Sequence, residues 1–251
     1  MNLEQALESL PDTDHNVVSV LSGGLDSTIM TYILQKRYGS RRVFALSFKY
    51  GQKQIREVDM ARITCNWLGI SHKILDLDVL GDIAKKVSAN ISDSQIDMPT
   101  IKDVLGDPQP KTYIPFRNMI LNAFAFSYAE VNQASHVFTG LQVHDEYGYW
   151  DTTAKFVSFM NAVASQNRTH QAKLEAPFSH LSKYQEILIA EEMGDVLYNF
   201  TLTCYNPNSA GESCGVCPSC SERIANFAKA KVKDPISYSI FIPWEELCAQ
   251  S

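Results

Sequence analysis

A loop rich in glycine and hydroxyl side chains lies early in the chain, with the sequence Ser22-Gly23-Gly24-Leu25-Asp26-Ser27-Thr28. The apolar residues 17–21 before it predict a buried strand, and residues 29–34 after it predict a helix. A Gly-Gly turn in that position presents free backbone N–H groups and the positive end of a helix dipole to an anion. Glycine also lets a phosphate approach the backbone closely. The loop therefore predicts a phosphate site, to which hydroxyl groups add further donors.

Asp26 needs a separate explanation, because a carboxylate repels a bare phosphate. A divalent cation bridging Asp26 to the phosphates would remove this conflict, so the loop also predicts magnesium. The loop lacks the Gly-Lys-Ser/Thr ending of kinases and GTPases, and it lacks the three spaced glycines of the dinucleotide fingerprint. The alternative is a tight turn with a Ser or Asp helix cap and no ligand.

Four of the six cysteines gather in one short window, at Cys204, Cys214, Cys217 and Cys220. The last three form Cys-x-x-Cys-x-x-Cys, a spacing that lets successive sulfur atoms converge on one ion. Four thiolates suit a tetrahedral zinc site, and an iron–sulfur cluster takes the same ligands. We favour structural zinc because no second cluster motif occurs, and a redox pair would need only two cysteines. Cys65 and Cys248 stand in apolar stretches and are expected to be buried.

The composition limits the class of protein. The chain has 251 residues and a formal net charge of −6, which argues against a general nucleic-acid binder. No apolar run is long enough to span a bilayer, and the acidic N-terminus lacks the apolar segment of a signal peptide. We therefore expect a cytoplasmic protein without a membrane partner, whose cysteines are not paired in disulfides.

Strand and helix patterns alternate along the chain. Further strands are expected at 43–48, 72–77 and 136–140, and helices at 55–67, 118–131 and 184–193. This alternation predicts an α/β fold, with a doubly wound, mainly parallel sheet and the loop at its carboxyl edge. The polar stretch 82–111 predicts a long functional loop. We divide the chain into a domain that carries the glycine loop, 1–176, and a C-terminal helical, zinc-binding region, 177–251.

The order Ser-Gly-Gly-x-Asp-Ser resembles the loop of the PP-loop ATP-pyrophosphatase superfamily, whose members split ATP between the α and β phosphates. Together with the cysteines, it makes the chain resemble the 7-cyano-7-deazaguanine synthase family, the nitrile-forming ligases of queuosine biosynthesis. Other segments match that family: Tyr50-Gly51-Gln52 with Glu57, Pro115-x-Arg117-Asn118, Thr203-Cys204-Tyr205, and Arg223.

The resemblance implies a ligase that adenylates the carboxylate of 7-carboxy-7-deazaguanine and uses ammonia to form first the amide and then the nitrile. It implies ATP, Mg²⁺ and Zn²⁺ as cofactors and a homodimer as the assembly. ATP would contact Leu21, Ser22, Gly23, Gly24, Leu25, Asp26, Ser27 and Thr28. Catalytic roles would belong to Asp26, Ser27 and Arg117. The acceptor would contact Arg117, Asn118, Asp145, Tyr149, Trp150, Asp151 and Lys183.

Several of these residues also have an ordinary structural interpretation. Arg117 could form a surface ion pair, Lys183 could be solvated, and Tyr149 and Trp150 could be core aromatics. The turn that Pro115 fixes before Arg117 favours a role in the site.

One stretch departs from the family pattern Asp-x-x-Gly-Tyr-Pro-Asp-Cys-Arg. Trp150 replaces the proline, Thr152 the cysteine and Thr153 the arginine. An arginine would pair with a carboxylate or a purine edge, and tryptophan offers a stacking face instead. Because we expect this segment to line the acceptor pocket, the acceptor stays open. A diverged enzyme could stop at the amide or adenylate another carboxylate.

Two other classes remain as alternatives. One is a different PP-loop enzyme, such as a tRNA thiolase or an NAD synthetase. A thiolase would need a reactive cysteine near the loop and a basic face for tRNA. A cysteine-ribbon binding module with an inert loop is the other class. The intact Ser-Gly-Gly-x-Asp-Ser sequence argues against it.

Overall fold

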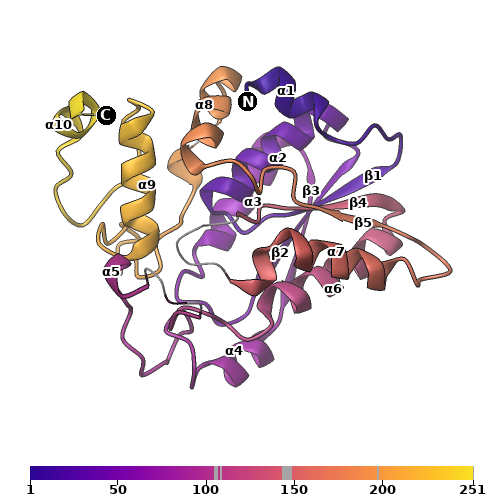
Figure 1. Cartoon of the computed structure of the whole chain (residues 1–251), viewed down its shortest axis with the longest axis horizontal. Coiled ribbons are helices and arrows are strands. Elements are labelled where there is room, and N and C mark those ends of the chain that lie inside the picture. The colour runs from indigo at the N-terminus through magenta and orange to yellow at the C-terminus, as the bar shows by residue number, and fades with distance from the viewer. Residues whose placement is uncertain (105–106, 108, 143–148, 197, 251) are drawn as a thin grey trace.

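A parallel sheet forms the centre of the molecule (Figure 1). The structure is a computed structural model that describes the chain except for residues 105–106, 108, 143–148, 197 and 251. Within the described residues the strand order is β3-β2-β1-β4-β5. The strands are β1 (Asn16–Val20), β2 (Val43–Lys49), β3 (Ser71–Asp76), β4 (Ala134–Thr139) and β5 (Lys173–Glu175). All pairings are parallel, which confirms the predicted α/β class.

Helices cover both faces of this sheet (Figure 1). One face carries α1 (Leu3–Glu8), α2 (Leu25–Tyr38), α3 (Glu57–Leu68) and α8 (Lys183–Met193). The other carries α4 (Asp78–Ala84), α6 (Arg117–Val131) and α7 (Ala154–Ala164). Successive strand residues point to opposite faces, so Val17 packs in the core under α2 and Val18 in the core under α6. The sheet is therefore buried on both sides, as an open parallel sheet requires.

The order of the strands in the sheet indicates where a ligand would bind. The connection from β1 leads to β2 on one side of the sheet, whereas β4 joins β1 on the other side. This reversal is a topological switch point, and open α/β sheets bind ligands there, beyond the carboxyl ends of the strands. The glycine loop, residues 21–24, follows β1 at this edge and ends where α2 begins.

The C-terminal region packs onto the same core. It contains η2 (Tyr198–Phe200), α9 (Pro218–Lys229) and α10 (Trp244–Gln250) in addition to α8. Phe227 of α9 and Ile187 of α8 belong to the core that α2 also lines. The two parts of the chain therefore share one apolar core. The division at residue 176 stays a prediction.

Two expectations about local structure need correction. The stretch 82–111 is not wholly a loop, since it contains the end of α4 and a short helix α5 (Ile101–Val104). Cys65 is buried in the core as expected, but Cys248 is only partly buried because α10 carries no buried residues. Trp244 and Leu247 next to it are also only partly buried, so the apolar residues around Cys248 predicted more burial than the packing provides.

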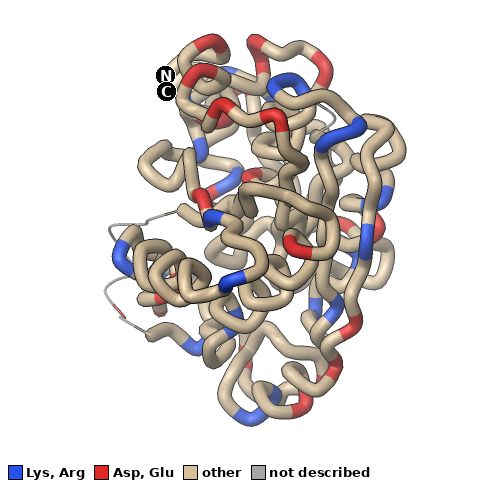
Figure 2. The backbone as a smooth tube through the Cα atoms, turned by 90° about the vertical axis from the view of Figure 1, so that its right-hand side faces the viewer, with Lys and Arg blue, Asp and Glu red and all other residues tan. Residues whose placement is uncertain are grey.

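Charged residues of both signs are interspersed along the chain (Figure 2). Among the described residues, we find no helix with the length and apolar character needed to cross a membrane.

Candidate active site

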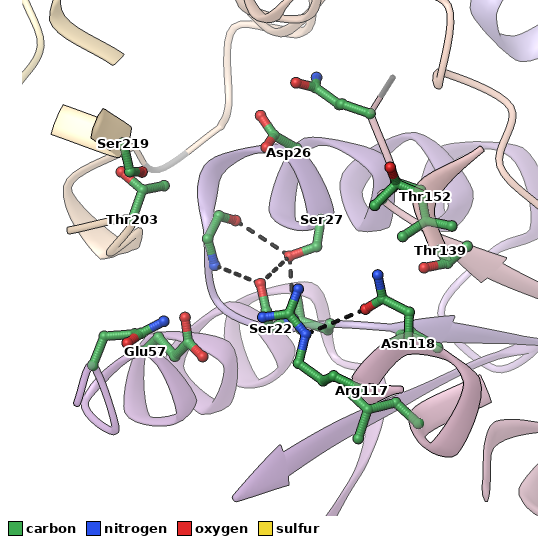
Figure 3. Close-up of a pocket in the computed structure, with 18 of the residues that line it drawn as sticks. Ser22, Asp26, Ser27, Glu57, Arg117, Asn118, Thr139, Thr152, Thr203 and Ser219 are labelled. Atoms are coloured by element: carbon green, nitrogen blue, oxygen red, sulfur yellow. Dashed lines mark hydrogen bonds between the residues drawn. The ribbon is translucent and has the colours of Figure 1, made fainter. Parts of the chain in front are cut away.

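The glycine loop is held by its own hydroxyl groups. Ser22 Oγ and Ser27 Oγ lie 2.9 Å apart, and the Gly24 N–H donates to Ser22 Oγ at 3.1 Å. Gly23 has a φ of +92°, and a Cβ there would overlap the backbone carbonyl of Glu57, so only glycine fits. Asp26 and Ser27 in the first turn of α2 line the same opening, and the first N–H groups of a helix have no partners within it. Figure 3 shows Ser22 and Ser27 at the centre of this opening.

A pocket of about 260 Å³ opens in front of the loop. Segments far apart in sequence line it: the glycine loop, the end of β2, the starts of α3 and α6, the end of β4, and the C-terminal region (Figure 3). Predicted site residues in the lining are Leu21, Ser22, Gly24, Asp26, Ser27, Arg117, Asn118, Tyr149 and Lys183. Gly23, Leu25 and Thr28 are not among the residues that line the pocket.

Several buried polar atoms in this lining have no hydrogen-bond partner. They are Asp26 Oδ1, Gln54 Oε1, Thr203 Oγ1 and both amide atoms of Gln142. Buried polar atoms are nearly always hydrogen-bonded in native proteins, so several unpaired ones in a single pocket indicate that it binds a polar partner. This favours a binding site over a loop without a ligand.

Lys183 is a buried cation beside the glycine loop. Its side chain is 5% exposed, and Nζ lies 3.4 Å from Asp26 Oδ2 and 2.9 Å from Glu222 Oε2. Burial lowers the pKa of Lys183, but the two carboxylates outweigh this effect and the pKa is raised. Lys183 is therefore a permanent positive charge. The alternative of a solvated lysine is wrong.

Glu186 lies behind this pair, one turn along α8. Burial raises the pKa of its carboxyl well above the ordinary value, and the nearby Asp26 carboxylate raises it further. The Glu186 carboxyl is therefore held in its neutral form beside the charged Lys183.

Arg117 begins α6 after a strained residue. Phe116 has a φ of +54°, a left-handed conformation that is costly for a bulky side chain and that marks functional sites. This turn aims the Arg117 side chain toward the glycine loop (Figure 3). Its Nε donates to Asn118 Oδ1 at 3.3 Å. Burial lowers the pKa of Arg117, but Tyr50 and Asp151 more than offset it, and the pKa is raised.

Asn118 joins α6 to the segment η1 (Trp150–Thr152). Its backbone N–H donates to Asp151 Oδ2 at 3.2 Å, and its Nδ2 donates to the Asp151 carbonyl at 3.1 Å. Asp151 does not line the pocket. It positions Asn118, which does line the pocket.

The four cysteines of the cluster meet in space. Their sulfur atoms all lie within 4.8 Å of one another, and the Cys214 and Cys220 sulfurs are 3.9 Å apart. Backbone N–H groups of Asn206 and Cys214 donate to Cys204 Sγ at 3.3 and 3.2 Å, as they do to metal-bound thiolates. The group could hold a metal ion. It lies next to the pocket, whose lining includes Thr203 and Ser219.

Comparison with known proteins agrees with this geometry. Residues 16–231 match the family described as "Queuosine biosynthesis protein QueC". The chain belongs to the QueC family. A 7-cyano-7-deazaguanine synthase from Psychrobacter sp. (strain PRwf-1) is 33% identical over 237 residues, covering 90% of this chain and 91% of that protein. Another from Marinomonas sp. (strain MWYL1) is 36% identical, covering 88% of this chain and 97% of that protein.

The fold also resembles a solved structure outside the QueC family. The U34-tRNA thiolase NcsA from Methanococcus maripaludis, with its [4Fe-4S] cluster, superposes with a TM-score of 0.51. That match covers 90% of this chain and 71% of the thiolase at 17% sequence identity, so it shows a shared fold.

Only part of the stretch that departs from the QueC pattern, residues 149–153, lines the pocket. Tyr149 and Thr152 line the pocket, whereas Trp150 and Thr153 do not. Trp150 Nε1–H donates to the Tyr113 hydroxyl at 2.8 Å, and its ring packs edge-on against Phe116 and Phe156.

Thr153 caps α7 by accepting a hydrogen bond from the Phe156 N–H at 3.1 Å. Contrary to the expectation for this stretch, two of its three substituted positions therefore support the scaffold. Asp145 lies outside the described residues, and its predicted role stays a prediction.

Some lining residues were given no role by the sequence. Glu57, Gln54, Glu222 and Gln142 belong to this group. Glu57 and Gln54 follow the carboxyl end of β2, and that position is the signal that could have identified them. Glu222 and Gln142 had no comparable signal, because packing of the C-terminal region brings Glu222 to Lys183.

Arg223, which matched the family, is fully buried and forms a bidentate pair with Asp234 at 2.6 and 2.9 Å, so its role is structural.

Proposed function

We propose that the protein is an ATP-dependent ligase that forms 7-cyano-7-deazaguanine from 7-carboxy-7-deazaguanine and ammonia. Membership of the QueC family supports the reaction. The observation that carries the proposal is the pocket itself, in which the glycine loop, Asp26, the buried Lys183 and the half-buried Arg117 face one space. Two cations and a helix N-terminus suit a triphosphate and an acidic acceptor.

The polar groups near the glycine loop have separate chemical tasks in this proposal. The loop N–H groups and Ser27 hold the leaving pyrophosphate, and Lys183 neutralises its charge. Arg117 holds the acceptor carboxylate or the α-phosphate, with Asn118 fixing its orientation. Asp26 would hold magnesium, which offsets negative charge on the phosphates when it is bound. Asp26 Oδ1 fits that role because it is buried without a partner.

The proposed chemistry proceeds in two rounds. An oxygen of the acceptor carboxylate attacks the α-phosphorus of ATP, the bond to the pyrophosphate breaks, and an acyl adenylate forms. Ammonia attacks the acyl carbon, loses a proton, and displaces AMP to leave the amide. The amide oxygen then attacks the α-phosphorus of a second ATP, which releases a second pyrophosphate and one N–H proton. Loss of AMP and the remaining N–H proton leaves the nitrile. The protein positions the reacting atoms and stabilises charge throughout.

We infer that the cysteine cluster holds one zinc ion. Zinc–sulfur bonds of about 2.3 Å place tetrahedral sulfur ligands about 3.8 Å apart, and the 3.9 Å between Cys214 and Cys220 fits this spacing. A four-iron cluster would sit between its ligands and hold the sulfurs farther apart. Zinc would supply structural cross-linking. The homodimer and the cytoplasmic location stay predictions.

Acceptor-dependent release of AMP tests this function. With 7-carboxy-7-deazaguanine, ammonia and ATP together, chromatography should find AMP and pyrophosphate, and omission of the acceptor should abolish both. ADP and phosphate as products would contradict the adenylation chemistry. A 7-amido product in place of the nitrile would identify a diverged enzyme that stops after one round.

A further inference from the structure

The pocket has a side rich in hydrogen-bond acceptors. We propose that Glu57, assisted by Gln54, recognises the donor edge of the acceptor base, the ring N1–H and the 2-amino group of a deazaguanine. The inference rests on the proposed function, because it takes a deazaguanine as the acceptor. In this proposal Glu57 determines which base is bound, and other groups of the pocket bind the phosphates.

Glu57 is held in a fixed position. It is 7% exposed, and its Oε1 accepts a hydrogen bond from Gln52 Nε2 at 3.3 Å. Gln52 is itself fixed, since its Oε1 accepts from the Tyr50 N–H at 2.8 Å and its Nε2 also donates to the Phe48 carbonyl at 3.0 Å. The carboxyl group therefore keeps one orientation, and it lines the pocket. Preorganisation of this kind is what selective recognition needs.

Gln54 provides the second observation. Its side chain is buried and lines the pocket, and its Oε1 has no hydrogen-bond partner. The Glu57 N–H donates to the Gln54 carbonyl at 2.8 Å, so one turn of chain places both residues at the same wall. Thr203 Oγ1, also buried without a partner, lies on the same side in Figure 3, opposite Asn118 and Thr139.

These groups fit a ligand edge with adjacent donors. An ionised carboxylate only accepts hydrogen bonds, so it matches an N1–H beside a 2-amino group. The edge of adenine alternates a donor with an acceptor and matches a carboxylate poorly. In the empty pocket, burial raises the pKa of Glu57 to about 8, whereas the Gln52 amide and the Arg117 charge act to lower it. Tyr50 is the other titratable group that faces it. Two donors of a bound base would lower this pKa further and favour the ionised carboxylate. We therefore place the acceptor base at Glu57 and the adenine of ATP elsewhere in the pocket.

Equilibrium binding tests the assignment without requiring turnover. Calorimetry would compare 7-carboxy-7-deazaguanine with its analogue that lacks the 2-amino group. The wild-type protein should prefer the first by about a hundredfold or more, because the analogue leaves buried acceptors unpaired. Glu57→Gln should reduce that ratio at least tenfold, since its amide donors oppose those of the base. Affinity for a non-hydrolysable ATP analogue should not change.

Asp59→Asn is the matched control, because it removes an exposed carboxylate from the same helix. It should keep the wild-type ratio. A preserved ratio in Glu57→Gln would overturn the inference, as would a loss of affinity for the ATP analogue alone, which would place adenine at Glu57. If Glu57→Gln fails to fold, the wild-type comparison still decides, because equal affinity for both bases contradicts the inference.

The outcomes also separate the inference from the proposed function. If the wild-type protein forms the nitrile while Glu57→Gln keeps the ratio, only the role of Glu57 fails. If the wild-type protein binds neither base, both proposals fail together.

Discussion

At the scale of single residues, one buried lysine balances the carboxylates next to the glycine loop. Lys183 contacts Asp26 and Glu222, and Glu186 behind them is kept neutral by burial. Asp26 thus faces both a fixed cation and the pocket, where one of its oxygen atoms has no partner. This residue can hold a metal ion without losing its ion pair.

Replacement of Asp26 should therefore abolish turnover and leave the fold intact. Asp26→Ala removes the predicted magnesium ligand and leaves Lys183 paired only with Glu222. We expect kcat to fall by about a hundredfold or more, on the scale of losing one charge-stabilising group. Steady-state AMP release measures the effect. Asp59→Ala on α3 serves as the control, and Asp26→Ala with normal turnover would exclude Asp26 from the mechanism.

Glu57 gives a dependence of stability on pH. Burial raises its pKa to about 8, so the folded protein holds a proton that the unfolded chain loses near pH 4.5. Between these values the native state binds more protons, and the stability from Glu57 decreases as pH rises toward 8.

The effect is measurable against Glu57→Gln, which does not titrate. Relative to that variant, the wild-type protein should lose up to roughly 3 kcal/mol of stability between pH 5.5 and pH 8. Denaturant unfolding of both proteins at the two pH values tests this. A constant difference between them would contradict a neutral Glu57 in the empty pocket.

At the scale of elements, one short segment joins the two strongest signals of the sequence. Thr201 accepts a hydrogen bond from the buried Arg223 at 2.8 Å, and the Leu202 N–H donates to the Gly23 carbonyl at 2.9 Å. Thr203 lines the pocket, and Cys204 is the next residue. The segment thus links the glycine loop directly to the cysteine cluster. If the cluster loses its ordered structure, the pocket should also be perturbed.

Loss of the metal should consequently weaken nucleotide binding as well as stability. We expect Cys217→Ser to contain less zinc, to melt at a lower temperature and to bind the ATP analogue more weakly. Cys248→Ser is the matched control, because Cys248 lies in α10, is partly exposed and does not belong to the group of four cysteines. Elemental analysis and melting curves of the two variants provide the measurement. Full metal content or unchanged melting in Cys217→Ser would contradict the account.

The cap of α7 gives a second test at this scale. Thr153→Ala removes the hydrogen bond to the Phe156 N–H and should destabilise the protein by about 1 kcal/mol. Because Thr153 does not line the pocket, the KM for the acceptor should not change. A large change in that KM would show that Thr153 reaches the acceptor after all.

At the scale of the whole molecule, most of the fold follows from sequence patterns. Apolar strands, the glycine turn and the cysteine spacing are local features, and the structure has them where the residues predict. Groups that depend on long-range packing were not predictable, such as Glu222 beside Lys183. The α7 cap shows a similar limit, since comparison with a family pattern assigned Thr153 to the pocket, and only the coordinates place it at a helix end.

The central claim is that this pocket makes a nitrile from a carboxylate. Mass spectrometry of the product from 7-carboxy-7-deazaguanine, ¹⁵N-labelled ammonia and ATP tests it most directly. The account predicts 7-cyano-7-deazaguanine carrying one ¹⁵N atom, with AMP and pyrophosphate as co-products. Unchanged acceptor, or a product without the label, would contradict it.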